Sequence, residues 1–150
     1  FYGGIIGHAQ GLDVILNAAK QLENYENIKF VLLGNGPEKE RLLKLKAELG
    51  LNNLQFYDAV PKSQMQKIIM DTNASIIPLK RLDLFKGAIP SKIFENLALK
   101  KPIILGVEGE AEELFIQQGK CGVSFTPEDS EDLAKQYGGR LNGKWIYGMG

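Results

Sequence analysis

The sequence has 150 residues, and its 18 acidic and 18 basic side chains balance. This balance excludes the basic surface with which proteins bind nucleic acids, so no nucleic-acid partner is expected. A chain of this length can bury roughly 70% of its unfolded surface in one core, and we expect a single domain over residues 1–150. No run of about 18 consecutive apolar residues predicts a membrane span, and no basic segment leads into an apolar export signal.

The chain has one cysteine, Cys121, which cannot form an internal disulfide. A reduced thiol beside an apolar run is typical of a protein in a reducing compartment. We therefore expect Cys121 to be buried and the protein to be cytoplasmic.

Short apolar segments alternate along the chain with longer segments of helical period, which is typical of repeated strand–helix units around a parallel sheet. The expected strands are 1–4, 29–33, 54–57, 74–78, 102–105 and 122–125. The expected helices are 12–23, 37–49, 62–71, 91–99, 110–118 and 130–136. The pattern predicts an α/β fold with six parallel strands.

Both ends of the sequence are irregular. Phe1 to Gly4 has the composition of a strand end without its beginning, so we expect further chain before it. The tail, Tyr137 to Gly150, contains five glycines and the single tryptophan, and its conformation is left open.

Ligands of open parallel sheets bind beyond the carboxyl ends of the strands, so the loops at that edge are the candidates for a site. The first loop, residues 3–11, contains four glycines that would let the backbone approach a phosphate. A dinucleotide fingerprint would also need an acidic residue at the end of the second strand, where Leu33 and Gly34 stand instead. NAD binding is therefore disfavoured, and His8 in this loop is a weak candidate for a polar contact with a ligand.

The loop of residues 79–89 leads through Pro90 into a predicted helix that begins near Ser91. Free N–H groups at a helix start attract anions, and a diphosphate fits this description. Glu95 lies four residues after Ser91, on the same helix face, and its side chain leans back toward the helix start. Its carboxylate could accept two hydrogen bonds from a vicinal diol, while Lys92 could add a positive charge for phosphate.

Five short motifs follow one another along the chain, each present once. They are Gly4 with Gln10-Gly11-Leu12, Leu33-Gly34-Asn35-Gly36-Pro37, Pro90-Ser91-Lys92, Phe94-Glu95-Asn96-Leu97-Ala98 and Lys101-Pro102-Ile103-Ile104. In order and spacing the sequence resembles the group-1 retaining glycosyltransferases, and the Gln-Gly-Leu and Pro-Ser-Lys variants resemble the branch that builds bacterial surface polysaccharides. The resemblance implies a Rossmann-like, doubly wound domain that forms the C-terminal half of a two-domain GT-B enzyme.

The resemblance also implies a role for particular residues. Glu95 matches the glutamate that holds the ribose hydroxyls. The diphosphate would lie against Gly4, Ser91, Lys92 and Ile93. The nucleotide base would be bound at Tyr57, Asp58, Ala59 and Val60. The donor sugar would meet the loop of Gly87, Ala88 and Ile89.

The activity implied is transfer of a glycosyl group from a nucleoside diphosphate sugar, expected to be UDP-linked, with retained configuration and without a metal or a cofactor. The acceptor, a polysaccharide or a lipid-linked saccharide at the inner membrane face, would bind a separate N-terminal domain. This chain alone would then bind donor weakly and catalyse nothing.

Three departures from the family pattern concern charge. Gly87 stands eight residues before Glu95, where many members place a second glutamate that touches the donor sugar. Ile5 and Gln10 stand in the first loop, where many members have an arginine and a lysine. These positions leave open whether the site is active.

We expect Lys92 to be the catalytic group that stabilises the departing diphosphate, with help from Lys86 or Arg81 in the adjoining loop. Two alternatives remain at this point. A sugar-nucleotide epimerase shares the architecture and would convert the donor without an acceptor, and a non-catalytic binding module would bind nucleotide only.

Overall fold

The computed structural model describes residues 1–138, in which short parallel strands alternate with helices. The strands are β1 (Tyr2–Gly3), β2 (Phe30–Leu33), β3 (Leu54–Tyr57), β4 (Ser75–Pro78), β5 (Ile103–Gly106) and β6 (Gly122–Ser124). The helices are α1 (Asp13–Gln21), α2 (Lys39–Leu49), α3 (Lys62–Asp71), the 3₁₀ turn η1 (Asp83–Phe85), α4 (Lys92–Ala98), α5 (Glu110–Glu112), the π-helical η2 (Glu113–Gln118) and α6 (Ser130–Gly138). The α/β fold expected from the sequence is confirmed.

The strands form two parallel ladders that meet at β1 and β4. One ladder has the order β1-β2-β3 and the other β4-β5-β6. The Phe1 nitrogen donates to Ala74 O at 3.0 Å, and Ile76 N–H donates to Phe1 O at 2.7 Å. These bonds place the strands in the order β3-β2-β1-β4-β5-β6, so the expected six-stranded arrangement exists as two ladders joined just before β1.

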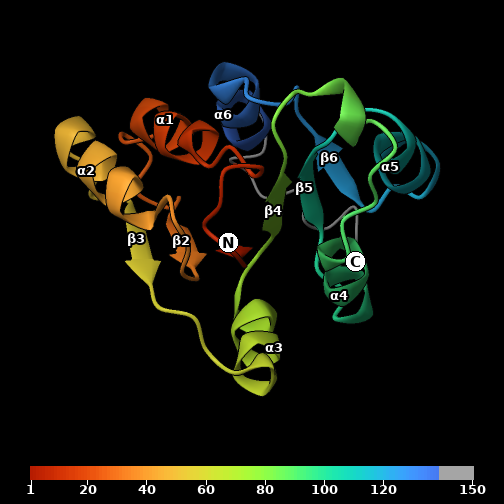
Figure 1. Cartoon of the computed structure of the whole chain (residues 1–150), viewed down its shortest axis with the longest axis horizontal. Coiled ribbons are helices and arrows are strands. Elements are labelled where there is room, and N and C mark those ends of the chain that lie inside the picture. The colour runs from red at the N-terminus through yellow and green to blue at the C-terminus, as the bar shows by residue number, and fades with distance from the viewer. Residues whose placement is uncertain (139–150) are drawn as a thin grey trace.

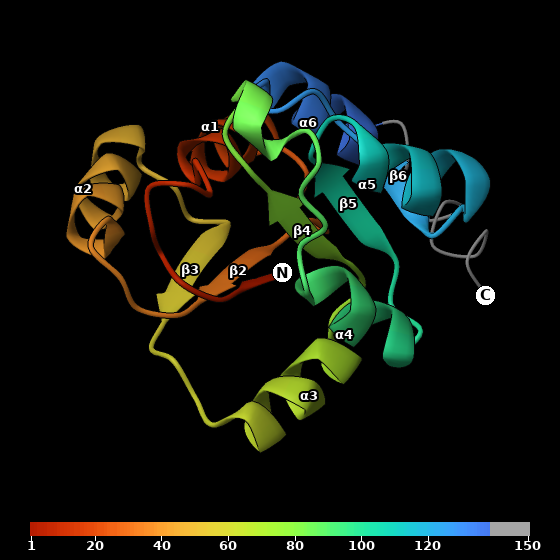
Figure 2. The same ribbon diagram turned by 45° about the vertical axis from the view of Figure 1, so that its right-hand side comes forward.

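Both faces of the central strands β4 and β5 are buried, because helices cover each side (Figure 1). Successive residues of β4 point to opposite sides: Ile76 packs with α1, α2 and α6, and Ile77 packs with α4 and α5. A third, smaller cluster forms around Phe1, Leu33 and Ile69 of α3. Figure 2 keeps the same division, with α1 and α6 on one side of the strands and α3 and α4 on the other. The fold is therefore doubly wound, as expected.

The differences from the sequence prediction are local. Helix ends shift by one or two residues, and the predicted helix 110–118 continues after Glu112 as a π-helix, in which Gly119 N–H bonds Leu114 O at 2.9 Å. Cys121 is half-buried instead of buried, because it lies at the edge of the α4–α5 cluster. The open tail lies outside the described residues from 139 onward. None of the helices within residues 1–138 has both the length and the apolar character that crossing a bilayer requires.

The loops after β1 and β2 are bonded to each other backbone to backbone. Gly4 N–H donates to Leu33 O at 3.0 Å, and Ile6 N–H donates to Asn35 O at 2.9 Å. A β carbon at Gly34 would overlap the Gly4 carbonyl, and one at Gly36 would overlap the Ile6 carbonyl. The two motif glycines thus allow an approach that fixes the position of Gly4.

Replacing Gly34 with alanine is expected to lower the free energy of unfolding by about 2 kcal/mol or more, because the loop after β1 must move away. Gly87→Ala is the matched control, since its β carbon meets open space, and should change stability by less than about 0.5 kcal/mol. Urea unfolding of both variants measures the difference. Equal stabilities would contradict the close approach.

Candidate functional site

A pocket opens between α3 and α4 beside β1 and β4, where the two ladders meet. Its free volume is about 370 Å³. The lining residues come from β1, the start and middle of α3, β4 and the first turn of α4: Phe1, Gly3, Gly4, Val60, Lys62, Met65, Ile69, Ser75, Ile76, Ile77, Ser91, Lys92, Glu95 and Asn96. The pocket therefore lies where the strand order reverses, which is where doubly wound folds bind ligands.

The structure brings together five of the residues that the sequence singled out. Gly4, Val60, Ser91, Lys92 and Glu95 all line this pocket. The predicted diphosphate and ribose contacts thus share one wall, formed by α4 and the turn after β1.

Lys92 crosses from α4 to the turn after β1. A β carbon at Gly4 would lie 2.5 Å from Lys92 Cε and 2.6 Å from Nζ, so the lysine end fills the space that glycine leaves. Nζ also lies 5.2 Å from the ring centroid of Tyr2. Burial lowers the pKa of Lys92, and the nearby Glu95 carboxylate opposes this shift. The pocket thus holds a partly desolvated cation at a glycine turn.

The first turn of α4 is held in place by the buried side chain of Asn96. Its Nδ2 donates to Lys92 O at 2.8 Å, and its Oδ1 accepts a short hydrogen bond from the Ser75 hydroxyl of β4. Ile93 is fully buried and its N–H already donates to Pro90 O at 3.1 Å. Within residues 1–138, the N–H groups of Ser91 and Lys92 have no backbone acceptor. These two amides are the donors available at the helix start, and Ile93 supplies packing.

Most of the predicted base segment lies outside the pocket. The side chain of Tyr57 is 53% exposed, and its carbonyl accepts Gly34 N–H at 2.9 Å. Asp58 Oδ1 pairs with Lys39 Nζ at 2.7 Å, and this pair lowers the pKa of Asp58. Ala59 is exposed, and Val60 alone of the four lines the pocket wall.

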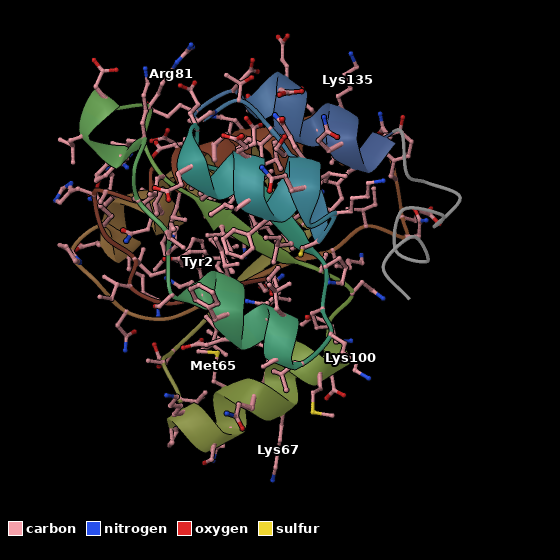
Figure 3. All side chains as sticks on the ribbon, turned by 90° about the vertical axis from the view of Figure 1, so that its right-hand side faces the viewer. Tyr2, Met65, Lys67, Arg81, Lys100 and Lys135 are labelled. Atoms are coloured by element: carbon pink, nitrogen blue, oxygen red, sulfur yellow. The ribbon has the colours of Figure 1, made fainter. Side chains whose placement is uncertain are left out.

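The loop of residues 79–90 lines a separate cavity of about 240 Å³. Arg81 Nε pairs with Glu108 at 3.1 Å, and Lys86 Nζ pairs with Asp83 at 3.2 Å. Figure 3 shows Arg81 at the top of the view, above Tyr2 near the middle and Met65 below it. These two cations, proposed from sequence as helpers of Lys92, are paired with carboxylates and line a different cavity from the one that Lys92 lines.

The predicted sugar-contacting residues belong to that same loop and lie outside both cavities. Gly87 is exposed, with open space where a β carbon would stand, and Ala88 N–H donates to Phe85 O at 3.0 Å. Ile89 is 37% exposed. The neighbouring carbonyl of Lys86 accepts Glu110 N–H at 3.0 Å, which ties this loop to the start of α5.

Sequence reasoning missed the wall opposite α4. Lys62 starts α3, and Met65 and Ile69 follow on the face that lines the pocket. The signal was available in part, because Met65 and Ile69 stand four residues apart on a helix whose other positions are mostly polar. The side of the sheet on which α3 packs was the missing information.

His8 keeps its place in the first loop but lies outside the pocket. Its Nδ1 lies 3.1 Å from Glu38 Oε1, and its side chain is 69% exposed. The contact joins the first loop to the start of α2 on the side away from α4.

Two curated relatives match most of this chain. Escherichia coli (strain K12) WcaI, named as a glycosyl transferase of colanic acid biosynthesis, is 29% identical over 134 residues, 88% of this chain and 32% of WcaI. Pseudomonas aeruginosa WbjE, named as a glycosyltransferase, is 26% identical over 136 residues, 90% of this chain and 33% of WbjE. The chain thus spans about a third of the length of these relatives.

Solved structures share the fold at lower identity. The catalytic domain of Helicobacter pylori cholesterol-α-glucosyltransferase superposes with a TM-score of 0.75 at 16% identity, over 96% of this chain and 87% of that one. Anabaena HepE in complex with UDP-glucose gives a TM-score of 0.77 at 16% identity, over 99% of this chain and 41% of HepE. The family model described as "Glycosyl transferases group 1" matches residues 1–137, and the chain therefore belongs to the group 1 glycosyl transferases.

Proposed function

We propose that this domain binds the nucleoside diphosphate sugar donor of a retaining glycosyltransferase in the pocket between α3 and α4. The observation that carries the proposal is the shared wall on which Lys92, Gly4 and Glu95 meet. A cation at a glycine turn suits a diphosphate, and a carboxylate one helical turn away suits the ribose diol. Structures of HepE with UDP and with UDP-glucose supply the nucleotide as a test ligand.

The diphosphate would lie between Gly4 and the first turn of α4. Lys92 Nζ already stands against Gly4, and the unpaired N–H groups of Ser91 and Lys92 lie on the same turn. Charge-assisted hydrogen bonds of this kind contribute about 1.5–3 kcal/mol each when well formed. A diphosphate bound there would also offset the free-energy cost of keeping the desolvated Lys92 charged, because it adds a second negative group to that of Glu95.

The ribose would sit beside Glu95, and the base would extend toward α3. Glu95 is exposed at the pocket edge, and Val60, Lys62 and Met65 form the opposite side. An ionised carboxylate accepts two hydrogen bonds from a vicinal diol, whereas the apolar Val60 and Met65 offer a surface for a flat base.

In the reaction, the acceptor hydroxyl oxygen forms a bond to the anomeric carbon as the bond between that carbon and the diphosphate oxygen breaks. The electron pair of the broken bond stays on the departing nucleoside diphosphate, whose phosphate oxygen can take up the hydroxyl proton. Negative charge therefore grows where Lys92 and the α4 amides point, and their fixed positions would stabilise it. Acceptor binding would fall to the region of such enzymes that this chain does not span, since it covers about a third of the relatives' length. The names of these relatives favour a saccharide acceptor in polysaccharide synthesis.

Glu95→Gln is expected to weaken UDP binding by about ten-fold or more, because two charge-assisted hydrogen bonds to the ribose are lost. The same change should leave the affinity for 2′,3′-dideoxy-UDP unaltered, since that ligand lacks the diol. Calorimetric titration of both ligands with wild type, Glu95→Gln and the exposed control Glu48→Gln measures this difference. A loss that is equal for the two ligands would contradict the ribose contact.

The affinity for UDP is expected to fall at high pH, starting below the ordinary lysine range. Burial lowers the pKa of Lys92 in the free protein, whereas bound phosphate favours the charged form and raises it. Binding is therefore constant below the lowered pKa and weakens as the pH rises from that value toward the pKa of the complex.

Titrations between about pH 7 and pH 10 test this, with Lys92→Arg as the comparison because arginine stays charged throughout. Any ionisation of the nucleotide itself is common to both proteins. If the wild type and Lys92→Arg show the same pH profile, Lys92 does not carry the charge that binds the diphosphate.

A further inference from the structure

Lys92 lies in a seat formed by two residues of β1 and its following turn. Its Nζ stands 5.2 Å from the centroid of the Tyr2 ring, and its end occupies the space of the missing Gly4 side chain. A cation over an aromatic face is attracted by the negative face of the ring. The seat is formed by the strand and the turn after it, whereas the lysine comes from a helix ninety residues later in the chain.

The Tyr2 ring is itself buried and held by a hydrogen bond. The residue is 1% exposed within the main core, and its hydroxyl donates to Ile5 O at 2.6 Å. Burial raises the pKa of the Tyr2 hydroxyl, so the ring stays neutral and keeps this hydrogen bond. Figure 3 shows Tyr2 beside α4, with Met65 directed from α3 toward the same region.

We propose that Tyr2 is a positioning residue, whose ring, with the space left by Gly4, holds the Lys92 ammonium ready for a diphosphate. The inference rests on the proposed function and adds to it the group that orders the lysine. A free lysine side chain loses rotamer freedom on binding, and a lysine already held loses less.

The other charged groups around Lys92 do not replace this seat. Glu95 stands on α4 itself and raises the pKa of Lys92, in opposition to burial. Lys62 of α3 lines the opposite side of the pocket and carries the same sign. Tyr2 is therefore the neutral group from β1 that favours the charged form of Lys92.

A double-mutant cycle on the whole chain tests the proposal with UDP as the probe. Tyr2→Leu is expected to weaken UDP binding about five-fold, the size of one cation–π contact, whereas Tyr2→Phe keeps the ring and most of the affinity. In a Lys92→Met background the Tyr2→Leu change should have almost no effect. Tyr137→Leu is the matched control, because this residue packs on Phe30 in the main core, and it should leave UDP binding unchanged.

A second measurement needs no nucleotide. The pKa of Lys92, followed by NMR through its ε carbon in the ligand-free protein, should be lower in Tyr2→Leu than in Tyr2→Phe, because the ring favours the charged form. Should Tyr2→Leu fail to fold, Gly4→Ala takes its place, since its β carbon would displace the lysine end.

The outcomes separate the two proposals. The positioning role of Tyr2 is overturned if Tyr2→Leu weakens UDP binding equally in the wild type and in the Lys92→Met background. It is also overturned if the pKa of Lys92 is the same in Tyr2→Leu and Tyr2→Phe. A folded wild type that binds no UDP overturns the proposed function, while the NMR comparison still decides whether the ring holds the lysine. Undiminished UDP binding by Gly4→Ala would also contradict the seat.

Discussion

Two hydrogen bonds between Phe1 and the chain around β4 join the two ladders of this domain, and the position of the pocket depends on that junction. From this junction the strand order runs outward through β2 on one side and through β5 on the other, so the loops after β1 and β4 diverge. A crevice at such a point is a geometric consequence of strand order. The turn at Gly4 forms one wall of it, and the first turn of α4 reaches the same space.

The pocket has few charges, and their arrangement matters more than their number. Lys92 is partly desolvated against Tyr2 and Gly4, while Glu95 remains exposed at the rim. The cations of the adjoining loop, Arg81 and Lys86, are already paired with carboxylates. Lys62 of α3 and Lys92 of α4 are the cations that line the pocket, and Lys92 is the one that lies against the turn at Gly4 and the buried ring of Tyr2.

The support behind this wall is polar and buried. Asn96 links the Lys92 carbonyl to Ser75 of β4, which couples the start of α4 to the central strands. The backbone contacts of Gly34 and Gly36 hold the opposite turn. Both sides of the proposed diphosphate site are thus fixed before any ligand arrives, which reduces the entropic cost of binding.

Local sequence determined the elements of this fold with little error. The strand 54–57 and the helix 62–71 agree with the structure at both ends, because alternation and helical periodicity reflect contacts between near neighbours. The shared position of Ser91 and Glu95 also follows from spacing alone, and both line the pocket. Tertiary structure alone decided that Lys92 rests on Tyr2, that α3 forms the facing wall, and that Arg81 lies elsewhere. These contacts join residues far apart in the chain, and they depend on strand order and on which face each helix covers, which no local pattern specifies.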